Sequence, residues 1–558
     1  MKKSKWSLLL TLVLVLGVFL SACSSKGGGD NASSNGDKDG GSKKVNEPQV
    51  LNLVDSQEIP SMDSTKATDQ VSFIVFDNVF EGLYRFGKDD TPVPGVAKSH
   101  EMSKDGKVYT FHLNENAKWS NGDPVTANDF VYAWRKVVDP KTAAEYAYIM
   151  APVKNANAIM TKGNPLYGKV DKLGVEAIDE HTLKVTLEAP TPYFLGLTNF
   201  GPYLPQNEKF VKSKGDKYAL EADSLVYNGP FVLSSWKHNE GWQYKKNPNY
   251  WDKDNVKLDE INVKVVKDVA TAVNLYETGQ IDRTGLTADF VDQYKGKEDF
   301  HTLKGNSVYF LRLNEKNPVL KNKNIRKAID MAWDKKGLTD VILNDGSSPA
   351  YYLVPKNFTQ SPDGEDFRKI NGDLGEYNVD KAKEHWEKGL KAVGKKDVEI
   401  ELLNYDTDNS KKVGEYLKNQ LEKNLPGLKI KIKAQPFKQK LALETKMDYE
   451  MSYAGWGPDY KDPMTFIDLF VTGGSYNQMG YSNKEYDKLV NDAKKEADPK
   501  KRYEMMLKAE KILMDDQAIV PMFQNGSAYL QKPYVHDIVK HATGGDYSYK
   551  WAYIEGKK

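Results

Sequence analysis

Polar and apolar residues follow two different periods along this chain, and each period predicts one kind of element. Strict alternation over Lys107–Asn114 and His181–Ala189 predicts strands that bury one face. After Thr126 the apolar residues instead recur at helical spacing, and Thr126 is placed to cap the first turn. The early part of the chain therefore mixes half-buried strands with an amphipathic helix.

The second half of the chain alternates strand and helix patterns. Strands are predicted over Val398–Tyr405 and Leu428–Phe437, and amphipathic helices over Asp380–Gly394 and Lys411–Leu425. This order of elements, followed by the segment YEMSYAGW, predicts an α/β lobe. The expected fold class is α/β.

The first residues have the pattern of an export signal. A lysine-rich leader precedes an apolar run, Leu8–Leu20, that is too short to cross a bilayer comfortably. The tetrad Leu-Ser-Ala-Cys that ends at Cys23 resembles the bacterial lipobox, so we expect residues 1–22 to be removed and Cys23 to be acylated. The alternative is an ordinary secretory signal with an incidental cysteine. Lipidation is favoured because the chain has only 1 cysteine, which also excludes an internal disulfide.

Composition limits both the tether and the partners. Residues 24–44 are rich in Gly, Ser, Asp and Asn and contain no large apolar residue, so 23–44 is expected to be the anchor and a flexible tether. Loss of the leader's 3 lysines changes 79 basic residues to 76, against 78 acidic ones. This near-neutrality argues against nucleic acid as a partner. The remaining length predicts two or three globular domains in an expected monomer.

The residues give little support for an enzyme. No G-x-S-x-G, H-E-x-x-H or P-loop pattern occurs, and the 8 histidines are scattered without metal-ligand spacing. We therefore expect no metal and no cofactor. Asp459 and Asp462 could serve glycosidic cleavage at a suitable separation, which is the hydrolase alternative. From the residues alone, Asp459 could equally stabilise the turn in which it lies.

An ordered series of segments carries a family resemblance. AKWSNGDPVTANDFVYAWRKVVDP (Ala117–Pro140), NGPFVLSSW (Asn228–Trp236), NPNYW (Asn247–Trp251), NIRKAIDMAWDKKGL (Asn324–Leu338) and AGWGPDYKDPMTF (Ala454–Phe466) stand in the order found in large extracytoplasmic solute-binding proteins. These serve oligopeptide and dipeptide ABC importers, and the chain is most similar to oligopeptide-binding proteins of the OppA type. The resemblance covers about residue 50 to the C-terminus.

The resemblance implies a two-lobed periplasmic-binding-protein-like fold that encloses a ligand between its lobes. Lobe one would comprise residues 45–81, 201–306 and the tail 526–558. An extra domain, 82–200, would pack on lobe one largely away from the ligand. Lobe two would be 307–525, and the lobes would close by a hinge motion.

The segment around Asp459 carries the implied binding site. By position in the motif, Asp459 matches the family acid that takes the ammonium group of a peptide. Gly455 and Gly457 would allow a peptide backbone to approach and pair with the strand, and Trp456 would wall a side-chain pocket. Asp462 precedes Pro463 and is expected to cap a helix.

The chain also departs from the best-known family pattern. Tyr453 and Glu444 stand where some members have arginines that hold the peptide's C-terminus, and Arg312 stands in place of an acid. Phe437 replaces a tryptophan that lines a pocket, and Phe310, close to Arg312 in the sequence, is also expected to contact the peptide. Recognition of the N-terminus is therefore expected to be retained, whereas a looser site or one for longer peptides is expected at the other end.

These implications predict a lipid-anchored receptor on the outer face of the cell membrane. Its expected partners are oligopeptides and the subunits of an ABC permease with cytoplasmic ATPases. Two alternatives use the same fold: binding of a sugar, a nickel complex or haem, and a surface adhesin or chaperone-like role.

Overall fold

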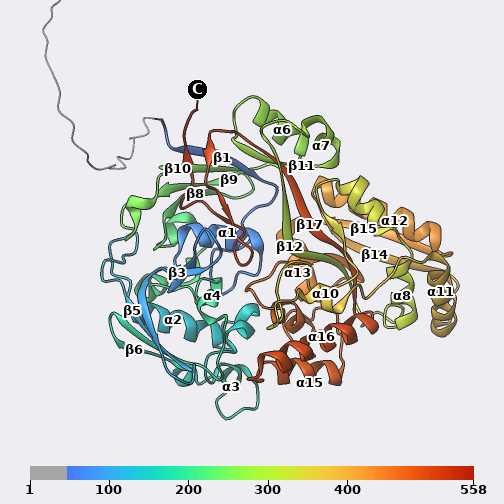
Figure 1. The fold of residues 1–558 in the computed structure, drawn as a ribbon, viewed down its shortest axis with the longest axis horizontal. Helices are drawn as coiled ribbons and strands as arrows, with labels where there is room; N and C mark the ends of the chain where they lie inside the picture. The colour runs from blue at the N-terminus through green and yellow to red at the C-terminus, as the bar shows by residue number, and fades with distance from the viewer. Residues whose placement is uncertain (1–46, 558) are drawn as a thin grey trace, which may run out of the picture. The chain divides into compact units, whose positions relative to one another are not determined.

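The computed structural model describes residues 47–557 (Figure 1). The expected signal peptide, Cys23 and the tether lie outside the described residues. Helices and strands alternate through the described chain, whose larger sheets are one of seven strands and two of four strands.

Lobe one is built on a four-stranded sheet in the order β1-β10-β9-β8. Its strands are β1 (Val50–Asp55), β10 (Glu260–Val265), β9 (Gly241–Lys246) and β8 (Phe231–Lys237). β1 runs parallel to β10, although some 200 residues separate them. Helix α1 (Gln70–Val79) begins after Asp69, which accepts a hydrogen bond from the Ser72 N–H at 2.9 Å. Asp69 therefore fixes the start of this helix.

The C-terminal tail returns to lobe one. Its short strands pair as β18 (Val535–His536) with β21 (Tyr553–Ile554), and β19 (Val539–Lys540) with β20 (Tyr547–Ser548). The Gln49 side chain donates to the Ile554 carbonyl at 2.8 Å, which joins the two ends of the described chain.

The segment expected to form the extra domain has a sheet of its own, in the order β4-β5-β7-β6. Its elements are β4 (Ala97–Met102), β5 (Val108–Leu113), β7 (Thr182–Thr186), β6 (Val175–Asp179) and helix α2 (Ala127–Val138). Thr126 precedes α2 as expected, and its N–H donates to the Asp129 carboxylate at 2.8 Å. A Cβ at Gly82 would lie 1.8 Å from the Thr198 carbonyl oxygen, so the expected borders of the segment meet. The border positions themselves stay predictions.

The largest sheet has the order β11-β17-β12-β16-β14-β15. Its strands are β11 (Arg283–Leu286), β17 (Ile519–Gln531), β12 (Phe300–Leu313), β16 (Met451–Trp456), β14 (Val398–Tyr405) and β15 (Leu428–Gln435). β11 lies in the range expected for lobe one, and most of the sheet lies in the range expected for lobe two. Its helices include α8 (Lys323–Met331), α11 (Val379–Val393), α12 (Asp408–Asn424), α13 (Phe437–Thr445), α15 (Lys484–Ala493) and α16 (Pro499–Asp515). The order strand, helix, strand was predicted correctly, and β14 has the predicted bounds.

The long strands β12 and β17 cross between the lobes (Figure 1). Their antiparallel register shifts between Lys304 and Val308. There the Asn525 side chain accepts from the Ser307 N–H at 3.0 Å. A Cβ at Gly305 would lie 2.2 Å from Asn525 Oδ1, so only glycine leaves room for this side chain. The predicted borders between the lobes, 306/307 and 525/526, lie close to this interruption of the ladder and stay predictions.

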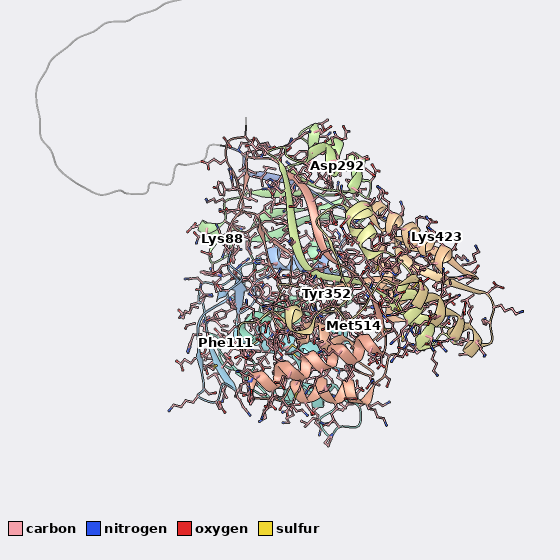
Figure 2. All side chains as sticks on the ribbon, turned by 45° about the vertical axis from the view of Figure 1, so that its right-hand side comes forward. Lys88, Phe111, Asp292, Tyr352, Lys423 and Met514 are labelled. Carbon is pink, nitrogen blue, oxygen red and sulfur yellow. The ribbon has the colours of Figure 1, made fainter. Side chains whose placement is uncertain are left out.

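Aromatic contacts join the segment 82–200 to lobe two. The Tyr193 ring stacks on the Tyr460 ring at a centroid distance of 4.4 Å. Many further side chains on both sides belong to one hydrophobic cluster, and a second cluster lies within lobe two. Phe111 and Met514, both labelled in Figure 2, belong to the first cluster. The Gly544 N–H of the C-terminal tail also donates to the Pro458 carbonyl at 3.0 Å, so the two lobes touch in this conformation.

Candidate binding site

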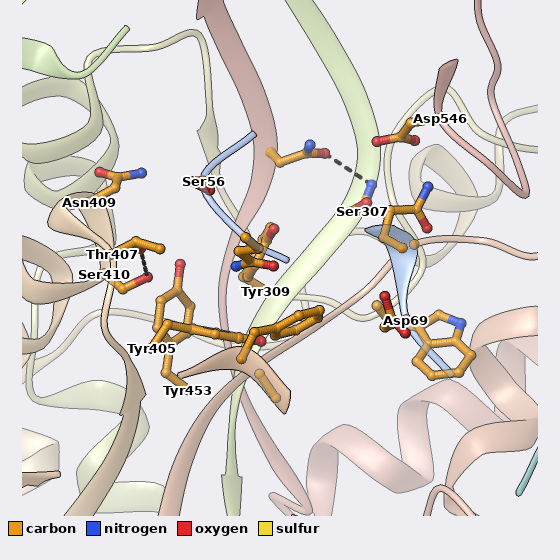
Figure 3. Close-up of a pocket in the computed structure, with 18 of the residues that line it drawn as sticks. Ser56, Asp69, Ser307, Tyr309, Tyr405, Thr407, Asn409, Ser410, Tyr453 and Asp546 are labelled. Atoms are coloured by element: carbon orange, nitrogen blue, oxygen red, sulfur yellow. Dashed lines mark hydrogen bonds between the residues drawn. The ribbon is translucent and has the colours of Figure 1, made fainter. Parts of the chain in front are cut away.

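A cavity of about 530 Å³ lies beside the crossing strands, between residues of both lobes (Figure 3). Lobe one contributes Asp69 and Phe73, the crossing strands contribute Tyr309 and Phe523, and lobe two contributes Tyr453 and Trp456. A volume of this size is typical of a ligand pocket. Since both lobes line it, their relative movement would open or close it.

Strand β16 offers part of its edge to the cavity. On one side it pairs with β12 along its whole length, from Met451 to Trp456. On the other side its register with β14 ends at Ser452. The following residues, Tyr453 to Gly457, line the cavity. This stretch of backbone can accept an added strand.

Asp459 follows this edge directly and is almost completely buried, at 5% exposure. Its Oδ1 atom accepts from the Tyr146 hydroxyl at 3.2 Å, while Oδ2 is buried without a hydrogen-bond partner. Burial raises the pKa of Asp459 well above its usual range, and the Tyr146 hydrogen bond only partly opposes this. Within residues 47–557 no cation lies within ion-pair distance of the carboxylate. The buried carboxylate therefore lacks a hydrogen-bond donor, and a positively charged donor would stabilise it most.

The wall beside Asp459 is aromatic. The Trp456 indole lies over the Tyr146 ring at 6.0 Å and meets Tyr476 edge-on at 4.6 Å. Trp456 belongs to the hydrophobic cluster and also lines the cavity. Trp456 is therefore both a residue of the hydrophobic core and part of the pocket wall.

Glycine is required on both sides of Trp456 for a packing reason that could not be predicted from the sequence. A Cβ at Gly455 would lie 2.7 Å from the Tyr309 ring, which is its register partner on β12. A Cβ at Gly457 would lie 3.0 Å from Ser307 Oγ. Both glycines line the cavity as expected. The group that packs closely against each of them belongs to β12, so close packing with β12 is the reason for glycine at these positions.

Arg312 and Glu444, the two charged departures from the family pattern, touch each other. Their side chains form a buried ion pair at 3.5 Å. Glu444 also pairs with Lys440 at 2.8 Å and accepts from Ser452 Oγ at 2.8 Å. Although burial alone would raise the pKa of Glu444, Lys440 and Arg312 hold it below its usual range. The two departures therefore pair with each other, but Glu444 is shared between Arg312 and Lys440, so the cluster keeps one net positive charge.

The other predicted site residues divide into two groups. Tyr453 and Phe437 line the cavity together with Arg312. Phe310 does not: its side chain is fully buried and packs edge-on against Phe470 at 6.0 Å. Phe310 therefore belongs to the core rather than to the pocket, and the register of β12 with β17 shifts between Tyr309 and Phe310.

Asp462 has the expected structural role. Its Oδ1 accepts from the Met464 N–H at 2.9 Å, at the start of helix α14 (Met464–Ile467). Its carboxylate also forms an ion pair with Arg502 at 2.7 Å. Asp462 is therefore occupied, which leaves Asp459 as the free carboxylate of this loop.

Sequence reasoning missed the contribution of the segment 82–200 to the pocket. Glu145 and Tyr146 lie in the short helical turn η1 (Glu145–Met150) and line the cavity, although this segment was expected to lie largely away from the ligand. Asp69 and Asp345 were also missed. No local pattern distinguishes these residues, since only the tertiary fold brings them to β16.

Two further observations concern the described part of the chain. From residue 47 to residue 557, no helix is both long enough and apolar enough to cross a membrane. In the same range no group of three or more His, Cys, Asp or Glu side chains is arranged to hold a metal ion.

The arrangement defines a class of protein: two lobes that enclose a solute in a pocket between them. The family model for "Bacterial extracellular solute-binding proteins, family 5 Middle" matches residues 91–478. The chain belongs to this family. Its members bind solutes for ABC transporters without chemical conversion, so the protein is not an enzyme.

Known proteins support the family assignment over the full length. The dipeptide-binding protein DppE of Bacillus subtilis is 37% identical over 551 residues, which cover 99% of each chain. The substrate-binding domain of a Bacillus anthracis oligopeptide ABC transporter is 52% identical and superimposes with a TM-score of 0.90, over 92% of this chain and 100% of that one. The structure of Listeria monocytogenes OppA bound to peptide is 47% identical in sequence and superimposes with a TM-score of 0.88, over 91% of this chain and 100% of that one. The two-lobed α/β fold expected from the resemblance is confirmed.

Proposed function

We propose that the protein captures extracellular oligopeptides and delivers them to an ABC permease. The peptide lies along the open edge of β16, and its ammonium group binds the Asp459 carboxylate. The observation that carries this proposal is the buried Asp459 Oδ2, which has no hydrogen-bond partner. An ammonium group supplies both a charge and several N–H donors at that point.

The names of similar proteins support a peptide as the solute. One relative is named a dipeptide-binding protein, and one similar structure is described as bound to peptide. A sugar would bring hydroxyl groups to Asp459 but no charge, and a haem or a nickel complex would bring no extended backbone to β16. An adhesin would need no enclosed pocket. A peptide uses both features of the site.

The proposal is tested by what the protein retains during purification. A pocket that recognises backbone and ammonium should accept many sequences, so native protein should release heterogeneous peptides on denaturation. Mass spectrometry of the released material detects them, and protein refolded from denaturant serves as the empty control. Recovery of a single sugar or cofactor instead of peptides would contradict the proposal.

We also propose that Cys23 anchors the protein to the outer face of the cell membrane through acyl chains. The lipobox-like tetrad and the polar tether support this, since two acyl chains give stable anchoring. Cys23→Ala should therefore release the protein into the medium or leave it unprocessed, as cell fractionation with an antibody would show. A variant that stays membrane-bound and acylated would contradict this anchor.

A further inference from the structure

The charges that line the cavity are unbalanced. Its two basic residues, Arg312 and Lys267, are both occupied by acids: Arg312 by Glu444 at 3.5 Å and Lys267 by Asp406 at 2.6 Å. Glu444 is shared with Lys440 at 2.8 Å, and Arg312 Nε has no hydrogen-bond partner. Within residues 47–557, the cluster of Arg312, Lys440 and Glu444 therefore keeps one net positive charge beside the cavity.

Four acidic residues of the lining, in contrast, have no ion-pair partner in the described chain. In the described chain, no ion pair involves Asp69, Glu145, Asp345 or Asp459, and their hydrogen bonds come from neutral donors. Two further lining acids, Asp408 and Asp546, do have lysine partners. Because the four unpaired carboxylates lie in one cavity, they attract cations and repel anions.

Asp345 lies beside an aromatic group. It comes just before β13 (Ser348–Pro349), and Pro349 and Tyr309 are both register partners of Phe523 on β17. The Tyr309 and Tyr453 rings are 5.6 Å apart, and Phe523 stacks on Tyr309 at 4.8 Å. Figure 3 shows Tyr309 and Tyr453 together in the pocket. Aromatic faces next to a carboxylate suit an ammonium or guanidinium group.

This aromatic group also lies where a bound peptide would run. Tyr309 is the register partner of Gly455, and Tyr453 is on β16 itself. A peptide paired with the open edge of β16 would thus present side chains to Tyr309, Tyr453 and Asp345. The side of the pocket that would bind the peptide backbone therefore also carries groups that would distinguish a basic side chain from an acidic one.

We propose that the pocket selects peptides with basic side chains, and that Asp345 with Tyr309 and Tyr453 forms the place where such a side chain binds. This inference rests on the proposed peptide function and adds a substrate class to it. A glutamate side chain at the same place would meet the like charge of Asp345.

The test uses peptides with free N-termini that differ only at one position, which carries Lys, Gln or Glu, with each position after the first varied in turn. At one position, the Lys peptide should bind about tenfold more tightly than the Gln peptide, and the Glu peptide more weakly than both. Asp345→Asn keeps an acceptor for the Ser347 N–H, which now donates at 2.9 Å, but removes the charge. It should lower the Lys-to-Gln affinity ratio severalfold.

Asp340→Asn is the matched control. Asp340 lies five residues earlier, is exposed and pairs with Lys336, so the ratio should stay at its wild-type value. The ratio cancels any general effect of a variant on folding. Equal binding of Lys, Gln and Glu peptides by the wild type would overturn this inference alone, as would a ratio that Asp345→Asn leaves unchanged. Failure of all three peptides to bind would instead overturn the proposed function.

Discussion

Asp459→Asn should weaken the binding of free peptides by about one hundredfold to a few thousandfold. The variant keeps the shape of the side chain and an acceptor for the Tyr146 hydroxyl. It removes the negative charge, so the ammonium group of the ligand would be buried without a counter-charge. Loss of one partner from a buried ion pair costs about 3–5 kcal/mol, and each 1.4 kcal/mol is a factor of about ten in affinity. Isothermal titration calorimetry measures the change.

Asp462→Asn is the control for this variant. Asp462 belongs to the same loop but is paired with Arg502 and caps helix α14. Its loss should lower the melting temperature and leave peptide affinity near the wild-type value. If both variants lost affinity equally, the effect of Asp459→Asn would come from the fold of the loop and not from contact with the ligand.

The same contact sets the pH dependence of binding. The ionised carboxylate binds the ammonium group, and burial raises the pKa of Asp459 in the unliganded pocket. Lowering the pH protonates the group and weakens binding, and this loss begins at a higher pH than it would for an exposed aspartate. Titration of the wild type across an acidic pH series should show the decline, and Asp459→Asn should not.

Arg368→Met should have the largest effect on stability among the substitutions considered. Arg368 lies in α10 (Phe367–Asn371) and pairs with Glu510 of α16, which has 0% exposure. Glu510 also accepts from the Asn371 side chain at 2.6 Å and from the Val354 N–H at 2.9 Å. Without the guanidinium group its charge is buried uncompensated, at a cost of about 3–5 kcal/mol. Denaturant unfolding followed by tryptophan fluorescence measures the loss.

Lys500→Met is the control for the stability prediction. Lys500 lies in the first turn of α16 and forms an ion pair with Asp363. Both side chains of this pair are more than half exposed. Removing such a pair should leave the unfolding midpoint unchanged within error. The second substitution Glu510→Gln should recover part of the Arg368→Met loss, since it removes the buried charge. A loss no larger for Arg368→Met than for Lys500→Met would contradict the role given to the buried pair.

The sequence predicted elements best where one period dominates and ordinary end signals are present. Helix α11 ends where Gly394 adopts a left-handed conformation, within one residue of the predicted end. Strand β15 was predicted too long because apolar spacing continues through Pro436 into Phe437. Proline cannot donate to the ladder, and α13 begins at Phe437 instead.

The candidate site was predicted only where one segment carries it. Asp459 and its neighbours lie in a single loop with a family resemblance, so they could be named from the sequence. Tyr146 and Asp345 come from distant parts of the chain and have no local signal. Phe310 and Tyr309 are adjacent residues on a strand buried on both faces, and the pattern could not tell which of them faces the cavity.

Contact between Asp459 and the ammonium group of a peptide can be measured by a titration of paired ligands. One peptide is prepared with a free and with an acetylated N-terminus, and each is titrated into the wild type and into Asp459→Asn. The account predicts that acetylation and substitution each abolish tight binding and that their effects are not additive, because both remove one contact. If the acetylated peptide binds the wild type as tightly as the free one, Asp459 does not hold the ammonium group and the account is contradicted.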